Sequence, residues 1–282
     1  MAAMMSSDQP RYREAHLAFV KSLAARGYTS ANTEIILQSP NPDPHSWSNT
    51  VRKFNAYRPD LIVAYGAPAA LVAMKESEGI PVVAADMYAP EKPPRGMCGV
   101  SSRVPLLMLF NIFQELRHHR RIGALYTARE AGSQRQLEEF RKLALQFGMS
   151  VEGANVASAP AVEAALDSML DKVDVIVATE SGIVCRQFDR IISRARARNI
   201  PVVATMPGAA ERGALLSLEI SPQEQGHLAA EIASRILEGA RAEHLSLLSP
   251  RRVDLIINLR VAREMGITMP FAALGAATRV IK

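Results

Sequence analysis

The sequence is poor in cysteine and in aromatic residues. Cys98 and Cys185 are the two cysteines among 282 residues, and they match neither a CxxC motif nor a metal-ligand spacing. Because they fall in different halves of the internal repeat described below, we expect free, buried thiols and not a disulfide. Aromatic residues make up 5% of the chain, and Trp47 is the single tryptophan. Aliphatic residues must therefore build most of the interior, which suits parallel sheets covered by helices.

Long apolar runs are missing as well. No stretch of 18 apolar residues occurs, which argues against a membrane-spanning helix. Residues 1–9 have neither the basic start nor the long apolar core of a signal peptide. The sequence thus predicts either a cytosolic protein or an exported one whose export segment lies outside this chain.

Catalytic signatures are not found either. There is no GxSxG, Walker, HExxH or strand-linked GxGxxG motif. The histidines stand away from the cleft ends of predicted strands, and we expect surface or core positions for all of them: His16, His45, His118, His119, His227 and His244. These absences argue against an enzyme and predict neither a cofactor nor a metal site.

The net charge of +5 is modest for this length. The basic residues are densest at residues 118–121 and at Arg194, Arg196 and Arg198. A nucleic-acid face would need a recognition helix or an aromatic platform beside them, and neither is present. Solvated helix surfaces are the better interpretation, so no nucleic-acid partner is expected.

An internal repeat organises the chain. Residues 59–64 and 173–178 are both short apolar runs introduced by an aspartate. Each is followed by a helical segment and then by a nearly identical run, at residues 80–84 and 200–204. This strand–helix–strand order with continuous apolar strands is typical of a parallel βαβ unit.

The repeat extends upstream. Phe19 and Gly27 stand in the first copy where Phe140 and Gly148 stand in the second, each pair on an amphipathic helix that ends at glycine. We therefore predict an α/β protein of two similar lobes, each a doubly wound parallel sheet, joined by a hinge with a ligand cleft between them. The expected N-terminal lobe is residues 1–103 with 222–245. The expected C-terminal lobe is residues 104–221 with 246–282.

The tail departs from the repeat. We expect a short strand within residues 211–217, an amphipathic helix over residues 223–237 and a strand over residues 255–257. A short helix is expected over residues 261–265.

Ligands of open α/β sheets bind beyond the carboxyl ends of the strands, so the residues after each strand are candidates. After residues 61–65, the turn from Gly66 begins a helix whose N–H groups could hold an anion, although it could equally be an ordinary turn. Asp86 could recognise an amine or simply close its turn, and Ser101 or Ser102 could instead be the N-cap of the next helix. The first-lobe candidates are Gln9, Tyr12, Gly66, Ala67, Pro68, Ala69, Asp86, Tyr88 and Ser101.

In the second lobe, polar residues follow three predicted strands that share one sheet edge. Each could be mere capping chemistry, but their convergence favours ligand binding. The second-lobe candidates are Tyr126, Thr127, Glu130, Ser133, Glu180, Ser181, Met206 and Gly208.

Several segments together resemble a known family. They are PDLIVAYGAPAA at residues 59–70, IPVV at 80–83, CGVS at 98–101, RIGALY at 121–126, GALLS at 213–217, and INLRVA at 257–262 followed by MGI at 265–267. From about residue 4 to 281 the chain is similar to substrate-binding proteins of ABC transporters, of the type that carries tryptophan or tyrosine. That resemblance implies the type I periplasmic-binding-protein fold.

The resemblance also implies a function and a set of ligand contacts. It predicts extracytoplasmic capture of a small molecule, such as an amino acid or related small carboxylate, for a membrane permease and its ATPase, by a protein expected to be monomeric. Family contacts transfer to residues 66–69, Asp86, Ser101, Glu130, Ser133, Glu180, Ser181 and residues 206–208. Where the family commonly has threonine, Asn-Ser, Asp-Asn and a polar residue, this chain has Ala67, Gly132-Ser133, Glu180-Ser181 and Met206. These departures favour a more apolar or differently charged solute than an aromatic amino acid.

The predicted mechanism is hinge closure, in which ligand favours the closed state through contacts available only there. A ligand-sensing module of the same fold is an alternative, and a kinase, cyclase or DNA-binding segment would favour it. An enzyme of the doubly wound class would need a nucleophile–base pair or a cofactor fingerprint at a strand end.

Overall fold

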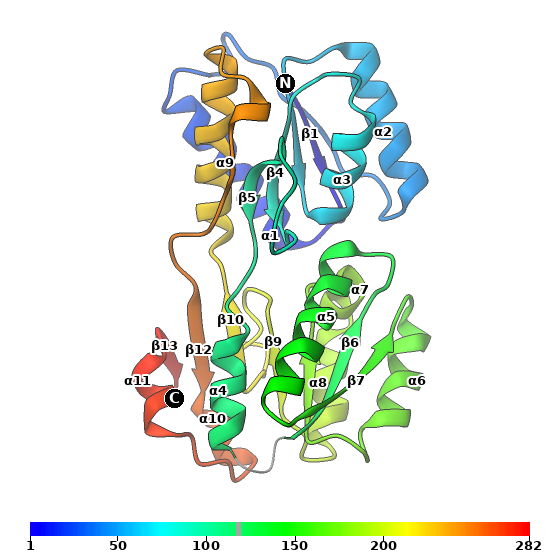
Figure 1. Cartoon of the computed structure of the whole chain (residues 1–282), viewed down its shortest axis with the longest axis vertical. Coiled ribbons are helices and arrows are strands. Elements are labelled where there is room, and N and C mark those ends of the chain that lie inside the picture. The colour runs from blue at the N-terminus through cyan, green and yellow to red at the C-terminus, as the bar shows by residue number, and fades with distance from the viewer. Residues whose placement is uncertain (117–119) are drawn as a thin grey trace. The chain divides into compact units, whose positions relative to one another are not determined.

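The computed structural model describes residues 1–116 and 120–282. The chain forms two compact units, Met1–Arg103 with Ser221–Arg251, and Val104–Ile220 with Arg252–Lys282, so it passes between them three times. Figure 1 shows the elements of both units. Residues 246–251, expected in the second lobe, belong to the first unit because strand β11 (Leu247–Leu248) pairs with β5 (Cys98–Ser101). Residue 221, also expected in the second lobe, opens the returning segment of the first unit.

A six-stranded sheet in the order β11-β5-β4-β3-β1-β2 forms the centre of the first unit, and its neighbouring strands are parallel. Its inner strands are short apolar runs buried along their whole length, as the sequence predicts for strands covered on both faces. The other strands are β1 (Ala2–Met5), β2 (Ile36–Gln38), β3 (Ile62–Tyr65) and β4 (Val82–Met87).

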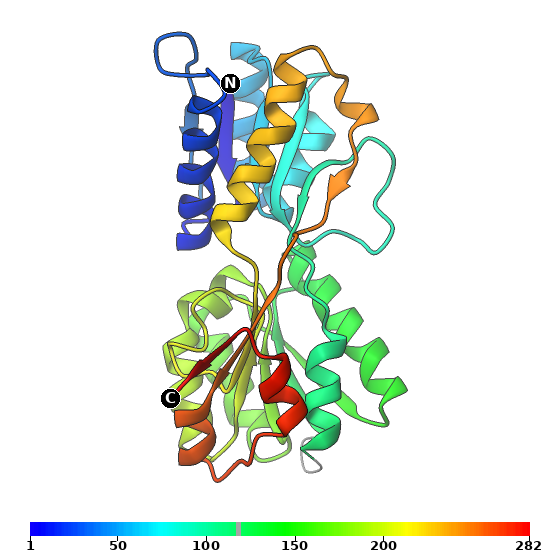
Figure 2. The same cartoon turned by 90° about the vertical axis from the view of Figure 1, so that its left-hand side faces the viewer.

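Two helix pairs cover the two faces of this sheet (Figure 2). One pair is α1 (Pro10–Ala24) and α9 (Pro222–Leu237). Helix α9 is the amphipathic helix expected over residues 223–237, and Leu228, Ile232 and Ile236 lie on its buried side. The other pair is α2 (Pro44–Tyr57) and α3 (Ala67–Glu76). A short 3-10 helix, η1 (Ala242–His244), follows α9.

Helices α1 and α9 approach unusually closely at Gly226. A Cβ atom on this glycine would lie 2.1 Å from the backbone oxygen of Ala15 and 2.7 Å from the backbone nitrogen of Phe19. Since neither atom can move without moving α1, only glycine allows this spacing.

The described part of the second unit contains a sheet in the order β13-β12-β10-β9-β8-β6-β7. It is not wholly parallel as predicted, because β10 and β12 run antiparallel. The chain leaves this unit after β10 and returns to it just before β12. Strand β10 therefore ends at the same end of the sheet at which β12 begins, and the two neighbouring strands run in opposite directions. The strands are β6 (Arg121–Tyr126), β7 (Ser150–Asn155), β8 (Val175–Ala178), β9 (Val202–Ala204), β10 (Leu216–Glu219), β12 (Asp254–Asn258) and β13 (Arg279–Ile281).

Helices again cover both faces of this second sheet. The amphipathic helix expected around Phe140 is confirmed as α5, where Leu137, Phe140 and Ala144 are buried and Phe147 packs against the core that contains Phe140 and Ala144. The helices are α4 (Leu107–Glu115), α5 (Ala131–Gln146), α6 (Ala159–Met169), α7 (Gly182–Arg186), α8 (Phe188–Arg196), α10 (Leu259–Glu264) and α11 (Phe271–Ala276).

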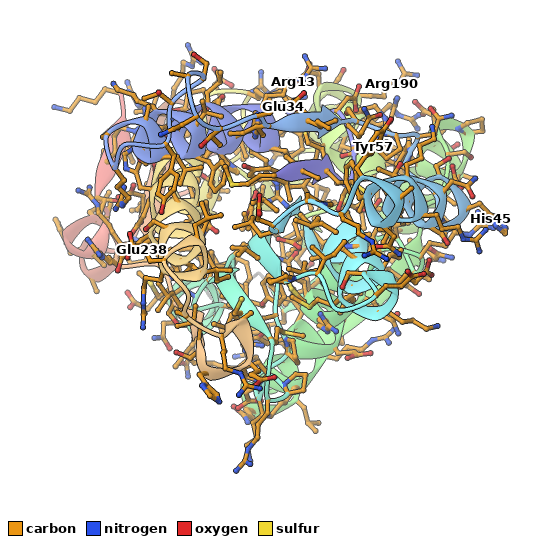
Figure 3. All side chains as sticks on the ribbon, turned by 90° about the horizontal axis from the view of Figure 1, so that it is seen from above. Arg13, Glu34, His45, Tyr57, Arg190 and Glu238 are labelled. Atoms are coloured by element: carbon orange, nitrogen blue, oxygen red, sulfur yellow. The ribbon has the colours of Figure 1, made fainter. Side chains whose placement is uncertain are left out.

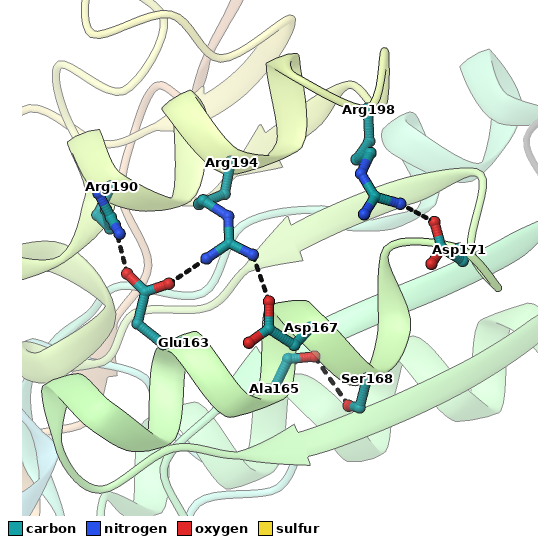
Figure 4. A network of polar contacts seen from close by, with 8 residues as sticks. All are labelled: Glu163, Ala165, Asp167, Ser168, Asp171, Arg190, Arg194 and Arg198. Carbon is teal, nitrogen blue, oxygen red and sulfur yellow. Dashed lines mark hydrogen bonds and ion pairs between the residues drawn. The ribbon is translucent and has the colours of Figure 1, made fainter.

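Part of the basic cluster on α8 is tied to acidic residues on and just after α6 (Figure 4). Arg190 and Arg194 both contact Glu163, Arg194 also contacts Asp167, and Arg198 contacts Asp171. The four-residue spacing on both partners aligns the pairs along the two helices. The structure thus gives these arginines, apart from Arg196, an intramolecular role in holding α6 and α8 together.

Several local predictions need correction. The strand expected within residues 211–217 begins only at Leu216, because a turn with Gly213 at φ +107° precedes it. The sequence also suggests a crossover over residues 99–102 ahead of the next helix, but residues 98–101 form strand β5. Cys98 is buried, and burial raises the pKa of its thiol to about 11, but Cys185 is only half-buried. Both cysteines are free.

Candidate strand-end binding site

Several candidates of the first unit, with Ser6 beside them, lie where its parallel strands end. Ser6 and Gln9 follow β1, Gly66 follows β3, and Tyr88 follows β4 directly. Ser101 is the last residue of β5. This common edge follows from parallel strand direction, which places all carboxyl ends together.

At Gly66, two side chains cover the start of α3: Ser6, which follows β1, and Tyr12 of α1. A Cβ at this position would lie 2.5 Å from the Tyr12 hydroxyl and 2.6 Å from Ser6 Oγ. Gly66 has φ +88°, and its N–H donates to the carbonyl of Ala85. Ala69 N donates to Ser6 Oγ at 3.0 Å, and Pro68 has no N–H. The anion cradle expected here is therefore reduced to the N–H of Ala67.

A buried ion pair lies beside this turn. Arg11 Nε is 3.1 Å from Asp86 Oδ2, and both side chains are at most 7% exposed. Arg11 also donates to the Tyr12 hydroxyl at 3.1 Å, with its guanidinium 4.9 Å from the Tyr12 ring centre. Burial raises the pKa of Asp86, while the Arg11 charge acts in the opposite direction. The carboxylate expected to meet an amine thus has a cationic partner of its own.

Gln225 of α9 holds the backbone of Asp86. Its Oε1 accepts from the backbone N–H of Asp86 at 2.9 Å, and its Nε2 donates to the carbonyl of Ser101 at 2.9 Å. Asp86 adopts φ +51°, a left-handed conformation that is uncommon outside glycine, asparagine and aspartate. The glutamine therefore joins the ends of β4 and β5 and supports a strained backbone position.

The remaining first-unit candidates lie nearby with local partners. Gln9 Nε2 donates to Ser7 Oγ at 3.3 Å. Tyr88 is fully buried, and the Arg103 guanidinium lies 5.5 Å from its ring centre. Ser101 Oγ accepts from the backbone N–H of Arg103. Neither Ser101 nor Ser102 caps α4, because that helix begins later, with Leu106 at its N-cap.

In the second unit, buried hydroxyls form a connected chain. Ser133 Oγ accepts from Thr127 N at 2.9 Å and lies 2.7 Å from Thr179 Oγ1. Thr127 Oγ1 lies 2.7 Å from both the Val156 carbonyl and Ser181 Oγ. Each hydroxyl has one proton, and each proton has an acceptor, because Thr179 Oγ1 donates to the Leu125 carbonyl at 2.8 Å and leaves Ser133 to donate to Thr179. Ser133, Thr127 and Ser181 thus brace the ends of β6 and β8.

Glu130 and Ser181 cap the short helix α7. Both Glu130 carboxylate oxygens accept from Gly182 N, at 3.1 and 2.9 Å, and Ser181 Oγ is the N-cap acceptor for Val184 N. The capping alternative raised from the sequence therefore describes these two side chains, which leaves α7 and the end of β8 firmly joined.

Gln136 of α5 reaches across the ends of β8 and β9. Its Oε1 accepts from Glu180 N at 2.8 Å and from Thr205 Oγ1 at 3.1 Å. Gln136 and Glu180 are buried, with 1% and 5% exposed. The side-chain amide of Gln136 thus links the residues that follow β8 and β9.

Met206 and Gly208 follow β9, and Glu219 is the last residue of β10. Met206 is buried, and Gly208 has φ +76°. Ser217 Oγ donates to Glu219 Oε1 at 2.6 Å. Burial raises the pKa of Glu219, with the hydrogen bonds from Ser217 and the Gly208 backbone acting in the opposite direction. Tyr126, the last residue of β6, is half-buried.

Sequence reasoning missed several residues at these edges. Ser6 and Arg11 lie on either side of the predicted Gln9, and Glu219 ends a strand that begins later than the sequence predicts. Gln136 and Gln225 lie on helices, where the helical pattern gives no signal that a side chain reaches a strand end 44 or 139 residues away.

The histidines occupy surface and core positions where the structure describes them. His16 is buried, with Nδ1 3.1 Å from the Tyr65 hydroxyl, and burial lowers its pKa. His45, His227 and His244 are exposed, and His45 points away from the fold in Figure 3. His118 and His119 lie outside the described residues. Among those described, no three His, Cys, Asp or Glu side chains gather as metal ligands, and no helix has the length and apolarity to cross a bilayer.

Comparisons with known proteins agree with this architecture. Residues 4–281 match the family model described as "ABC transporter substrate binding protein". A tyrosine-binding protein of Clostridioides difficile is 24% identical over 262 residues, which cover 89% of this chain and 76% of that protein.

Solved structures show the same fold. A conserved domain protein of Vibrio cholerae superposes with a TM-score of 0.91 at 26% identity, over 99% of this chain and 98% of that one. An ABC domain in complex with L-Trp from Streptococcus pneumonia gives the same TM-score and coverages at 24% identity. The cellobiose complex of the transcriptional regulator CelR gives 0.65 at 17% identity, over 91% of this chain and 83% of that one.

Because regulators share the fold, the fold alone does not separate transport from regulation. The family match spans nearly the whole chain and does separate them. That family consists of binding proteins and not of enzymes, in agreement with the sequence analysis. The chain therefore belongs to the family of ABC transporter substrate-binding proteins.

Proposed function

We propose that this protein binds a free amino acid, or a closely related small carboxylate carrying an amine, and delivers it outside the cytoplasm to an ABC permease driven by its ATPase. The proposal takes the protein to be a monomer without a nucleic-acid partner. Two relatives support the ligand class, one named for tyrosine binding and one solved with L-Trp.

The observation that carries the proposal is the buried Arg11–Asp86 pair beside the start of α3. Leaving one buried charge without a partner costs several kcal/mol, about 3–5 when one member of a pair is removed. A zwitterion presents both charges, so its carboxylate and ammonium can hydrogen-bond to Arg11 and Asp86 without leaving either uncompensated. A ligand with a single charge does not offer this balance.

The first test is to find the ligand. Native mass spectrometry of the purified protein should show a small added mass that is lost on denaturation. Isothermal titration with each of the twenty amino acids should then give a dissociation constant for at least one. If no amino acid binds and no amine-bearing carboxylate is carried through purification, the proposed ligand class is wrong.

The second test is Asp86→Asn. Asparagine tolerates the left-handed backbone at this position, whereas alanine would add strain to the lost charge. We expect binding of the amino acid to weaken by roughly 10- to 100-fold, in line with the loss of a charge-assisted hydrogen bond of about 1.5–3 kcal/mol. Asp60→Asn is the matched control, since Asp60 is exposed at the opposite end of β3. Equal affinities in the two variants would remove Asp86 from the site.

A further inference from the structure

Gln136 has one half of its amide used and the other half without a partner. Within the described residues, Nε2 is buried and has no hydrogen-bond acceptor. The side chain is 1% exposed, so bulk water does not reach it. A buried donor without an acceptor costs about 1–3 kcal/mol, which makes it an exception that requires a reason.

The orientation of this amide follows from its neighbours. Glu180 N–H can only donate, so the atom 2.8 Å from it must be the oxygen of Gln136. A flipped amide would place two donors together and would also face Thr205 Oγ1 with its nitrogen. Nε2 is therefore fixed beside the ends of β8 and β9.

Other polar groups at the strand ends of the second unit already have partners. The carboxylate of Glu130 caps α7, and that of Glu219 accepts from Ser217. The hydroxyls of Ser133, Thr127 and Ser181 are connected to one another or to Thr179. The second-unit edge thus supplies Gln136 Nε2 as a donor that the fold itself does not consume.

We propose that Gln136 Nε2 donates a hydrogen bond to an oxygen of the bound ligand and so determines which ligands are accepted. The inference rests on the proposed function, because it assigns a further contact to the same ligand. A site built to hydrogen-bond a ligand group discriminates strongly against analogues that lack the acceptor, since the protein group is then left buried and unpaired.

Gln136→Glu tests the donor alone. The variant keeps an oxygen for Glu180 N–H and Thr205 and replaces only the amino group. We expect the dissociation constant for the best-binding amino acid to rise at least tenfold at pH 8. Protonation of the new carboxyl restores an O–H donor, so part of the loss should return at pH 5. Gln134→Glu is the matched control, because it makes the same change on the same helix at an exposed position.

Two further measurements separate donor loss from charge repulsion or misfolding. The neutral variant Gln136→Met must also weaken binding while its circular dichroism remains that of the wild type. The side-chain NH2 resonance of Gln136, assigned by its absence in Gln136→Glu, must shift on ligand addition.

The outcomes are distinct. If the wild type binds an amino acid and both Gln136 variants bind it equally well, the inference is wrong and the proposed function stands. An unshifted NH2 resonance with the intact amino acid also overturns the inference. If the wild type binds none of the twenty amino acids and carries no amine-bearing carboxylate through purification, the proposed ligand class fails and the inference fails with it.

Discussion

At the scale of single residues, the site is built from groups that have partners within their own unit. Arg11 neutralises Asp86, Ser6 occupies Ala69 N–H, and Glu130 caps Gly182. Asp86, Ala69 and Glu130, which the sequence predicts as ligand contacts, thus also stabilise the strand ends of their own unit. The distinction matters for mutagenesis, because removing such a residue loosens a strand end as well as any ligand contact.

Glu219 gives a prediction for pH dependence. Burial raises its pKa in the folded protein, so folding favours its protonated form. The raised pKa therefore adds to the free energy of unfolding at low pH. This contribution is fully present below the unfolded pKa of about 4.5 and is lost as pH rises through the folded pKa of Glu219. We expect the wild type to lose stability relative to Glu219→Gln as pH increases from about 4 to 7.

Urea unfolding of both proteins across that pH range checks this prediction. The glutamine of the variant can still accept from Ser217, so the comparison isolates the charge. A constant difference between the two unfolding free energies, or one that grows in favour of the wild type at high pH, would contradict it.

The sequence predicts the position of these strand-end residues better than their partners. Residues 59–65 and 80–85 place Gly66 and Asp86 at one edge, because parallel strands share a direction. The contacts that Gln136 and Gln225 make depend on where α5 and α9 are placed along their sheets. Packing between distant segments sets that distance, and local pattern does not encode it.

At the scale of elements, helix spacing decides where these side chains arrive. Gly226 allows α9 to touch the backbone of α1, and the neighbouring Gln225 then reaches Asp86. The amphipathic pattern of residues 223–237 predicts α9 and its buried stripe. It does not predict that Gly226 is the point of closest approach, since nothing local marks its partner, Ala15.

Gly226→Ala should therefore be costly. Its Cβ would lie 2.1 Å from Ala15 O, so α9 must shift away from α1. We expect a loss of about 3 kcal/mol, at the upper end of overpacking costs, together with weaker amino-acid binding through displacement of Gln225. Chemical denaturation and titration calorimetry measure the two effects.

Gly275→Ala is the control for this helix experiment. Gly275 lies within α11, and among the described residues nothing outside the adjoining backbone lies within 4 Å of the position that a Cβ would take there. Alanine should therefore be neutral at this position or should stabilise the protein by up to about 1 kcal/mol. Similar unfolding free energies for the two alanine variants would show that α1 and α9 tolerate a wider spacing.

At the scale of the whole molecule, the candidate ligand groups are divided between two units. A ligand that binds strand-end groups of both would make the arrangement of the units depend on its presence. We expect small-angle X-ray scattering to show a lower radius of gyration at saturating amino acid. Asp86→Asn at the same ligand concentration is the control, and an identical radius with and without ligand in the wild type would argue against hinge closure.

The three passages of chain between the units have a consequence for biosynthesis. Helix α9, which completes the first core, comes after residues 104–220, so α1 emerges from the ribosome long before its partner. Ala24 and Pro222 are 198 positions apart (222 − 24), so at about 5–20 residues per second that interval is roughly 10–40 s. The second core in turn waits for β12 and β13 near the end of the chain. Neither core is complete until the chain has entered its unit for the second time, so both units stay partly unfolded while residues 104–220 are made.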